Sequence, residues 1–517
     1  MDVTIAMKKC IIHPYLFAVF PIVFLLAHNI EQTFFSNIIV PALFAVFITV
    51  FIFVILRFSV GDNKKAGLIT SLFLILFFSF GHIRRLVEDF VIGGLDIGRD
   101  RHILLFSAAI FVLATYWILQ TKKKLHNLTT VANVMAVTLV IIPLVSIGMY
   151  EFKRSPETEF PSENLVSDSD GALKKHEALP NIYYIILDGY AAQSTLKEIY
   201  NYDNAAFLQF LAERGFFVAD ESRSNYTQTF LSLSSSLNIR YINDLTEKVG
   251  MDLQNRAIPY QMIEDNTIWR FLNSRGYRFI HISSGSTEMT DKNGNADINF
   301  KGGKLDEFSL TLLETTALYP FIRHSVEADA RERVLYSFDS LARISRLSGP
   351  RFTFAHILVP HSPYVFGPNG EKVENPKLQL SGDNYWKFKE HYVNQVIFTN
   401  KKIMALVEAI LKTEKNPPII ILQGDHGPAS EGEGTKGLSL LKHILVKERM
   451  KIFNAYYLPV DGNKLLYKSI TPVNSFRLIF SHYFGADYPL LEDESYFSTE
   501  EEPYTFINVT DIAREDY

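Results

Sequence analysis

Five long apolar runs in the first 150 residues constrain this chain more than any other feature. A helix needs roughly 18 to 20 apolar residues to cross a hydrocarbon core of about 30 Å, and each run approaches or exceeds that length. No small-residue cleavage site separates the first run from the others, so we expect it to be retained rather than removed as a secretory signal. The sequence therefore predicts an all-α polytopic membrane domain of about five transmembrane helices over residues 1–150. The runs cover about 10–30, 36–58, 66–82, 102–120 and 129–150.

The lysine and arginine residues of the short loops set the expected orientation, because positive flanks are held on the cytoplasmic side. The opposite side carries Glu31 and a longer loop at 83–101, in which arginines and acidic residues balance. An odd number of spans that begins inside predicts a multi-pass protein of the plasma (inner) membrane, with residue 151 onward extracytoplasmic. The positive residues on the cytoplasmic side are Lys8, Lys9, Arg57, Lys64, Lys65, Lys122, Lys123 and Lys124.

Residues 151–180 are polar, contain proline and serine, and show no hydrophobic period, which is typical of a linker. We expect a soluble domain over 181–517. The net charge of −5 and the pI near 6.3 show no basic excess, so a nucleic acid is not an expected partner. Cys10 is the single cysteine, which excludes an internal disulfide.

In the soluble half, short runs rich in β-branched and aromatic residues alternate with helical stretches. That alternation predicts an α/β sheet with helices on both faces. Ligands of such sheets bind beyond the carboxyl ends of the strands, so these ends are where a site is expected. The expected strands are 182–187, 278–282, 351–358, 418–423 and 451–458, and the expected helices are 204–214, 264–275, 387–413 and 471–484.

Two of the predicted strands run directly into acidic residues. One is followed by Asp188 in the sequence DGY, and the other by Asp425 and His426 in the sequence GDHG. A single Asp-Gly pair is most often only a turn. Carboxylates and an imidazole at two strand ends, however, suit a divalent metal, with Zn or Mn more probable than Mg or Ca.

A third element, residues 224–237 with the sequence SNYTQTFLSLSSSL, has the composition of a loop that leads into a helix. A hydroxyl at a helix N-terminus, beside a divalent cation, can be deprotonated and attack phosphorus, and the first amides of the helix can hold phosphate oxygens. The same composition also suits a helix cap with a packing face of small residues. The residues alone leave both readings open.

The sequence PHSPY follows the strand expected at 351–358 and puts His361 near a strand end. An imidazole there can act as a general acid for a leaving group or donate to a phosphate oxygen. His356 lies within the strand itself, and we interpret it as a buried structural residue.

Taken in chain order, these motifs resemble the alkaline-phosphatase superfamily, in the branch of membrane-embedded sulfatase-like proteins that includes lipoteichoic-acid synthases and phosphoethanolamine transferases. The resemblance covers about 181–500 and implies that the C-terminal domain has an α/β alkaline-phosphatase/sulfatase-like fold. Five membrane helices ahead of an extracytoplasmic catalytic domain are also similar to those proteins.

The resemblance implies a role for each motif. Thr229 would be the nucleophile and would also touch the metal. It is preferred to Thr227 because TQTFLS has its second threonine where the transferases have their nucleophile. The implied metal ligands are Asp188, Thr229, Asp425 and His426, the catalytic residues are Thr229 and His361, and the expected substrate contacts are His361, Asn225 and Tyr190.

Three departures from the family narrow the expectation. No CxPxR-like motif is present, so sulfate-ester hydrolysis by a formylglycine is not expected. No DxxxH-type ligand pair lies between 230 and 424, so one divalent metal is expected rather than two. Asp188 stands where the lipid-using synthases and transferases have glutamate, which favours a hydrolase over a transferase.

The leading hypothesis is a metal-dependent phosphotransferase that moves a phospho-head group from a membrane lipid donor to a cell-envelope acceptor through a phospho-threonine intermediate. The alternative is a sulfatase-like phosphoester or phosphodiester hydrolase at the membrane surface. From another class, a non-catalytic membrane scaffold that keeps the fold is also considered. The sequence GEGTKG at 432–437 fits GxGxxG but lacks the strand-turn-helix context of a dinucleotide site, so no nucleotide cofactor is expected.

Overall fold

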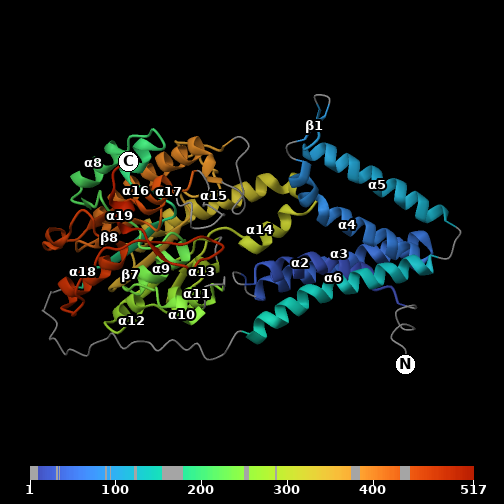
Figure 1. Cartoon of the computed structure of the whole chain (residues 1–517), viewed down its shortest axis with the longest axis horizontal. Coiled ribbons are helices and arrows are strands. Elements are labelled where there is room, and N and C mark those ends of the chain that lie inside the picture. Colours follow the sequence, from blue (N-terminus) through green and yellow to red (C-terminus); the bar gives the residue numbers. More distant parts are fainter. Residues whose placement is uncertain are drawn as a thin grey trace. The chain divides into compact units, whose positions relative to one another are not determined.

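A computed structural model of the chain divides into two compact units (Figure 1). Unit 1 combines Met1–Pro161 with Leu305–Val326, and unit 2 combines Ser162–Lys304 with Glu327–Tyr517. Residues 305–326, from the sequence of the soluble half, therefore belong to the same unit as the membrane half. The structure describes residues 10–30, 33, 35–87, 90–92, 95–121, 125–153, 179–249, 255–285, 288–373, 385–430 and 443–517.

Unit 1 contains helices at all five predicted apolar runs. Within the described residues, four of them are long and apolar enough to cross a membrane, and α2 is a shorter apolar helix of 16 residues. The first run therefore forms a shorter helix than predicted: residues 10–12 are not helical, and a turn follows His28. The five helices are α2 (His13–His28), α3 (Ser36–Val60), α4 (Asn63–Val87), α5 (Asp100–Gln120) and α6 (His126–Lys153).

The loop predicted at 83–101 is partly structured. Helix α4 continues to Val87, so Arg84 and Arg85 lie in its last turn. Two short antiparallel strands follow, β1 (Val91–Ile92) and β2 (Leu95–Asp96). Helix α14 (Glu307–Glu314) and the first residues of α15 (Tyr319–Ile344) also belong to unit 1. Most of the predicted linker lies outside the described residues.

Unit 2 is built on a seven-stranded sheet in the order β4-β9-β8-β3-β7-β5-β6. The strands from β8 to β6 run parallel, whereas β9 is antiparallel to both of its neighbours, β8 and β4. Every residue of β3, β7 and β8 is buried, as expected for parallel strands covered on both faces. The strands are β3 (Ile182–Leu187), β4 (Phe217–Val218), β5 (Arg278–Ile282), β6 (Ile298–Phe300), β7 (Arg351–Ile357), β8 (Ile419–Gly424) and β9 (Asn454–Tyr457).

The helices of unit 2 include all four that the sequence predicted, with the expected helix at 264–275 reduced to α12. A small antiparallel pair, β10 (Tyr496–Phe497) with β11 (Ile507–Asn508), and two 3-10 turns, η1 (Tyr385–Lys387) and η3 (Gly462–Leu465), complete the described elements. Besides α15, the helices are α7 (Gln193–Glu198), α8 (Ala205–Glu213), α9 (Thr229–Leu237), α10 (Leu245–Val249), α11 (Ala257–Glu264), α12 (Thr267–Asn273), α13 (Glu288–Asp291), α16 (Lys389–Thr413), α17 (His443–Met450), α18 (Pro472–Phe484) and α19 (Thr510–Arg514).

The register of the sheet fixes where its functional ends meet. Leu187, the last residue of β3, pairs with Ile357 of β7 on one side and with Gly424 of β8 on the other. Because the three strands are parallel, the residues that follow them emerge at one edge. Asp188 and Asp425 are the next residues after β3 and β8, so the strand pairing itself brings the two carboxylates together.

Candidate functional site

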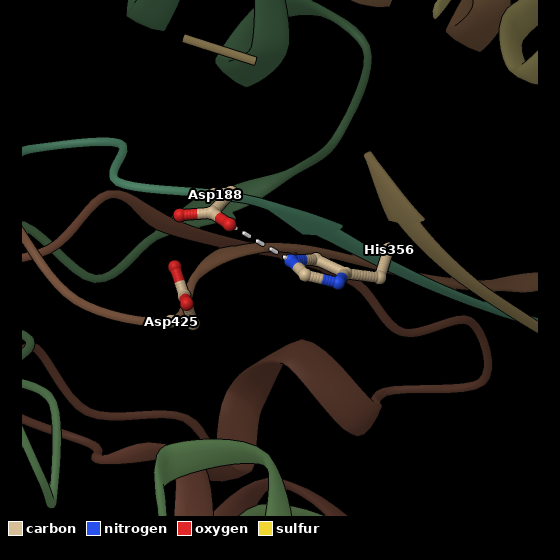
Figure 2. Close-up of side chains that lie close together, drawn as sticks. All are labelled: Asp188, His356 and Asp425. Atoms are coloured by element: carbon tan, nitrogen blue, oxygen red, sulfur yellow. Dashed lines mark hydrogen bonds and ion pairs between the residues drawn. The ribbon is translucent and has the colours of Figure 1, made fainter. Parts of the chain in front are cut away.

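Two carboxylates and an imidazole form a buried group at the carboxyl ends of the three central strands (Figure 2). Asp188, His356 and Asp425 each offer a ligand atom, and these atoms lie within 4.8 Å of one another. Nε2 of His356 lies 3.2 Å from Oδ2 of Asp188, the contact that is dashed in Figure 2. All three side chains are buried, so this group is screened from bulk water.

His426 and Thr229 lie next to this group of three residues. Nε2 of His426 lies 3.8 Å from Oδ1 of Asp188, 3.4 Å from Oδ2 of Asp425 and 2.9 Å from Oγ1 of Thr229. Nδ1 of the same ring lies 2.9 Å from the carbonyl oxygen of Gly427 and donates to it, so Nε2 carries the lone pair of the neutral ring. The structure therefore brings together all four side chains that the sequence suggested as metal ligands.

The two candidate hydroxyls have different surroundings. Thr229 is the first residue of α9, a position where helix amides and the helix dipole favour an anion. Thr227, by contrast, donates to the carbonyl oxygen of Ser498 at 2.8 Å and accepts from the amide of Ser498 at 3.2 Å. The Thr227 hydroxyl is therefore hydrogen-bonded to backbone groups, whereas the Thr229 hydroxyl points at His426.

His361 lies beside the carboxylates and is held in place from several directions. Its amide donates to the Asp188 carbonyl at 3.0 Å, its Nδ1 lies 2.7 Å from the Ser362 carbonyl, and its ring packs edge-on against Trp386 at 4.8 Å. Gly189 makes this packing possible, because its φ of 70° is left-handed and a Cβ there would lie 2.5 Å from the Trp386 ring. Gly189 thus leaves room for the Trp386 ring that packs against His361.

The electrostatics of the two carboxylates differ, although both are buried. Burial alone would raise the pKa of Asp188, but the positive charge of His361 and the hydrogen bond from His356 bring it below its ordinary value. Burial and then the charge of Asp188 raise the pKa of Asp425. Two buried carboxylates this close repel each other unless a positive charge lies between them.

The unsatisfied atoms point to a cation as well. Among the residues that the structure describes, no hydrogen-bond donor reaches Oδ1 of Asp188 or Oδ2 of Asp425, although both atoms are buried. Such atoms are rare in folded proteins, because an unpaired buried acceptor is costly. Two carboxylate oxygens, an imidazole nitrogen and a hydroxyl fit a divalent metal such as Zn²⁺ or Mn²⁺. The residues present therefore fit the metal that the motifs suggest.

His356 is the residue that sequence reasoning missed. It is buried within β7, as expected, but its ring joins the site instead of serving the core alone. Its Nδ1 lies 2.8 Å from Oγ1 of Thr290, and its Nε2 contacts Asp188. Its position could have indicated this role, because it lies one residue before the end of a central strand that pairs with the strand leading to Asp188.

The polar atoms of Asn225 and Tyr190, the other expected substrate contacts, are hydrogen-bonded within the protein. The Asn225 amide donates to the Glu494 carbonyl at 2.9 Å, and its oxygen accepts from the Val473 amide at 2.9 Å. The Tyr190 hydroxyl is fully buried and is hydrogen-bonded to Asn400 and Asn204. Both side chains hold loops together. The GxGxxG-like sequence at 432–437 lies outside the described residues.

The fold and the site define an enzyme domain in which carboxylates and imidazoles from the parallel strands and their carboxyl ends meet a hydroxyl at the start of α9. The model of the Sulfatase family matches residues 180–464, more than half of the chain. The chain therefore belongs to the Sulfatase family and is a sulfatase-like enzyme with an N-terminal helical membrane region. A comparison with curated proteins found no match.

Several solved structures are similar to this chain at low sequence identity. The C-terminal periplasmic domain of EcEptC from Escherichia coli, in complex with Zn, is 11% identical with a TM-score of 0.44, over 65% of this chain and 94% of that chain. The phosphoethanolamine transferase EptC domain from Campylobacter jejuni is 12% identical with a TM-score of 0.38, over 60% and 90%. The integral membrane lipooligosaccharide phosphoethanolamine transferase A (EptA) from Neisseria meningitidis is 11% identical with a TM-score of 0.39, over 90% and 94%.

Proposed function

We propose that this protein is a metal-dependent phosphotransferase that moves a phospho-head group from a membrane lipid to a cell-envelope acceptor, with Thr229 as the nucleophile. The observation that carries the proposal is the Thr229 hydroxyl, at the first residue of α9 and 2.9 Å from His426, beside two buried carboxylates. Membrane helices on the same chain support a lipid donor, because tethering raises its local concentration. The catalytic unit is proposed to face the extracytoplasmic side.

Asp188, Asp425, His426 and Thr229 would hold one divalent metal, with Zn or Mn favoured by the mixture of carboxylate and imidazole. When bound, the metal supplies positive charge that favours the ionised threonine and neutralises phosphate oxygens. The protein's own contribution is the rigid geometry. The Asp188 carboxylate is oriented by His356, and the Asp425 carboxylate accepts the Gly189 amide at 3.0 Å.

In the first half-reaction, Oγ of Thr229 attacks the phosphorus of the lipid after its proton has passed to solvent. A bond forms between this oxygen and phosphorus, and the bond from phosphorus to the lipid's oxygen breaks. His361, which lies beside Asp188, donates the proton that the departing lipid oxygen needs. The amides in the first turn of α9 favour the negative charge on the phosphoryl oxygens.

In the second half-reaction, the acceptor's hydroxyl gives its proton to His361 and its oxygen bonds to phosphorus. The bond between phosphorus and Thr229 breaks, and the threonine oxygen takes a proton back from solvent, which restores the hydroxyl. His361 thus returns to its starting protonation, so the same residue serves both halves.

A hydrolase is the second candidate, because Asp188 replaces the glutamate of the lipid-using transferases and water would then be the acceptor. Release of free head group, with no modified acceptor, would choose it. A non-catalytic scaffold, the third reading, predicts a protein without bound metal and without activity on model esters. The unpaired carboxylate oxygens of Asp188 and Asp425 oppose it, since a scaffold has no use for them.

The experiment compares Thr229→Ala with Thr227→Ala in the full chain, in membranes that contain a lipid with a radiolabelled phosphate head group. We expect Thr229→Ala to lose head-group release by at least about 10³-fold, the scale seen when a nucleophile is removed. Thr227→Ala is the matched control and should retain most activity, because among the described residues its hydroxyl is hydrogen-bonded to the backbone of Ser498. Full activity of Thr229→Ala would end the proposal.

A further inference from the structure

The segment Leu305–Val326 lies between β6 and β7 in the sequence of the catalytic half, yet it packs as part of the membrane unit. It consists of α14, a short connection and the first residues of α15, drawn in yellow in Figure 1. The chain therefore crosses between the two units three times, after Pro161, after Lys304 and after Val326. A single linker would need only one crossing.

The packing of this segment is apolar and close. Phe308 and Leu312, one helical turn apart on α14, share a buried cluster with Ile22 and Leu26 of α2 and with Ile38 of α3. Residues spaced by four lie on one face of a helix, so α14 presents its apolar face to the membrane helices. The segment is thus held by hydrophobic burial against two helices of the apolar half.

Backbone hydrogen bonds join the segment to a third helix. The Gly81 amide donates to the Thr315 carbonyl at 2.9 Å, and the Ala317 amide donates to the Phe77 carbonyl at 2.8 Å. Gly81 and Phe77 are four residues apart in α4, so these are the two groups that pair with each other in a regular helix. Gly81 allows the approach, because a Cβ there would lie 2.3 Å from the Glu314 carbonyl oxygen.

Charged and aromatic residues where this segment contacts α4 indicate the depth of the segment in the membrane. Arg84 lies 5.7 Å from the centre of the Tyr319 ring, and Arg85 pairs with Glu314 at 3.9 Å. Arginine and tyrosine at the end of an apolar span are typical of the boundary between hydrocarbon and water. The start of α15 is therefore at the level of the lipid head groups.

Two large apolar side chains at this level are exposed within the part of the chain that the structure describes. Leu318 is 43% exposed and Phe321 is 73% exposed, and they lie three residues apart, where the Phe321 amide donates to the Leu318 carbonyl. That spacing puts both on one face of the chain where α15 begins, with Leu318 directly before the helix. We propose that Leu318 and Phe321 insert into the head-group region of the bilayer, so that Leu305–Val326 is a second membrane anchor of the catalytic unit.

The lipid surface is the favoured occupant because this face continues from residues that already contact lipid in any membrane-spanning arrangement. Helix α3, which shares the buried cluster, also exposes Val40, Leu43 and Phe44. The anchor leads, through α15, into β7 and then to His361. The segment is therefore connected, along the chain, to the loop that carries His361.

The anchor can be tested by spin labelling, because Cys10 is the only cysteine. In a Cys10→Ser chain, a nitroxide at Phe321→Cys or Leu318→Cys is examined in nanodiscs of phosphatidylethanolamine and phosphatidylglycerol. Leu490→Cys, an exposed apolar site of the catalytic unit at 48%, is the aqueous control. Phe44→Cys, exposed on α3 at 66%, is the lipid control. Collision rates with oxygen and with a water-soluble nickel chelate are compared.

We expect both anchor sites to show a ratio of oxygen to nickel collisions between those of the two controls. A ratio equal to that of the aqueous control would overturn the proposal, as would protection from both reagents, which would indicate a protein partner. Gly81→Ala should move the Phe321 label toward the aqueous value, whereas Gly148→Ala, a helix glycine with nothing within 4 Å of its added Cβ, should leave it unchanged. These readouts do not depend on catalysis.

Discussion

Replacing His356 tests whether the metal site depends on a residue that is not one of the expected ligands. His356→Leu removes the 3.2 Å contact with Asp188 and the 2.8 Å contact with Thr290, while the leucine still fills much of the space. Loss of a group that orients a metal-bound carboxylate typically weakens metal binding by about 10 to 100-fold. That range corresponds to about 1.4 to 2.7 kcal/mol. We therefore expect the dissociation constant for Zn²⁺ to rise by this factor.

The assay is a competitive chelator titration of the purified full chain, which needs no substrate. His281→Leu is the matched control, since His281 is equally buried and bonds the carbonyl oxygen of Thr290 at 2.9 Å but has no contact with Asp188 among the described interactions. We expect that control to lower stability and to leave metal affinity within about twofold of wild type. Equal affinities for His356→Leu and wild type, or equal losses in the two variants, would refute the reasoning.

Three further predictions concern other parts of the site. Gly189→Ala should lower the free energy of unfolding by about 1 to 2 kcal/mol because of the left-handed backbone alone. It should also reduce turnover, because the added Cβ displaces Trp386 from His361. Thermal unfolding measures the first effect and kinetics the second, and an unchanged Tm would contradict the prediction. A chelator should abolish head-group release and Zn²⁺ or Mn²⁺ should restore it, whereas activity that survives exhaustive chelation would count against the metal. Burial raises the pKa of Glu448 above its ordinary value of 4.5, so its ionisation is less favourable in the folded than in the unfolded chain. Stability therefore falls as the pH rises from the ordinary pKa through the raised pKa. Glu448→Gln should weaken this loss as pH rises above 4.5, the ordinary pKa of the group, as pH-dependent unfolding would show; an identical pH profile would argue against it.

The sequence predicted the central part of the fold because the relevant signals are local. Strands β3, β5, β7 and β8 are short runs rich in β-branched and aromatic residues, and their bounds were predicted to within a residue. Asp188 and Asp425 could be assigned to one site because parallel strands end at one edge. The local composition of residues 224–237 also predicted a loop that leads into a helix, whereas the choice of Thr229 came from the family resemblance.

The features that the sequence did not predict depend on tertiary contacts. His356 could not be distinguished from a core histidine, because its role arises from the pairing of β7 with β3. Asn225 and Tyr190 stand next to the motifs in the sequence, but their side chains turn into the interior. Helix α14 shows nothing in its own residues to associate it with the membrane helices; the association depends on Gly81, more than 200 residues earlier in the sequence.

Mass spectrometry of the protein after incubation with membrane lipids is the most direct test of the central claim. The account predicts a covalent adduct on Thr229, with the mass of a phospho-head group, that disappears when an acceptor is added and is absent from Thr229→Ala. Rapid quenching in acid would preserve the adduct, and peptide mapping would assign it. Turnover of lipid with no adduct on Thr229, or an adduct that persists in Thr229→Ala, would contradict the account.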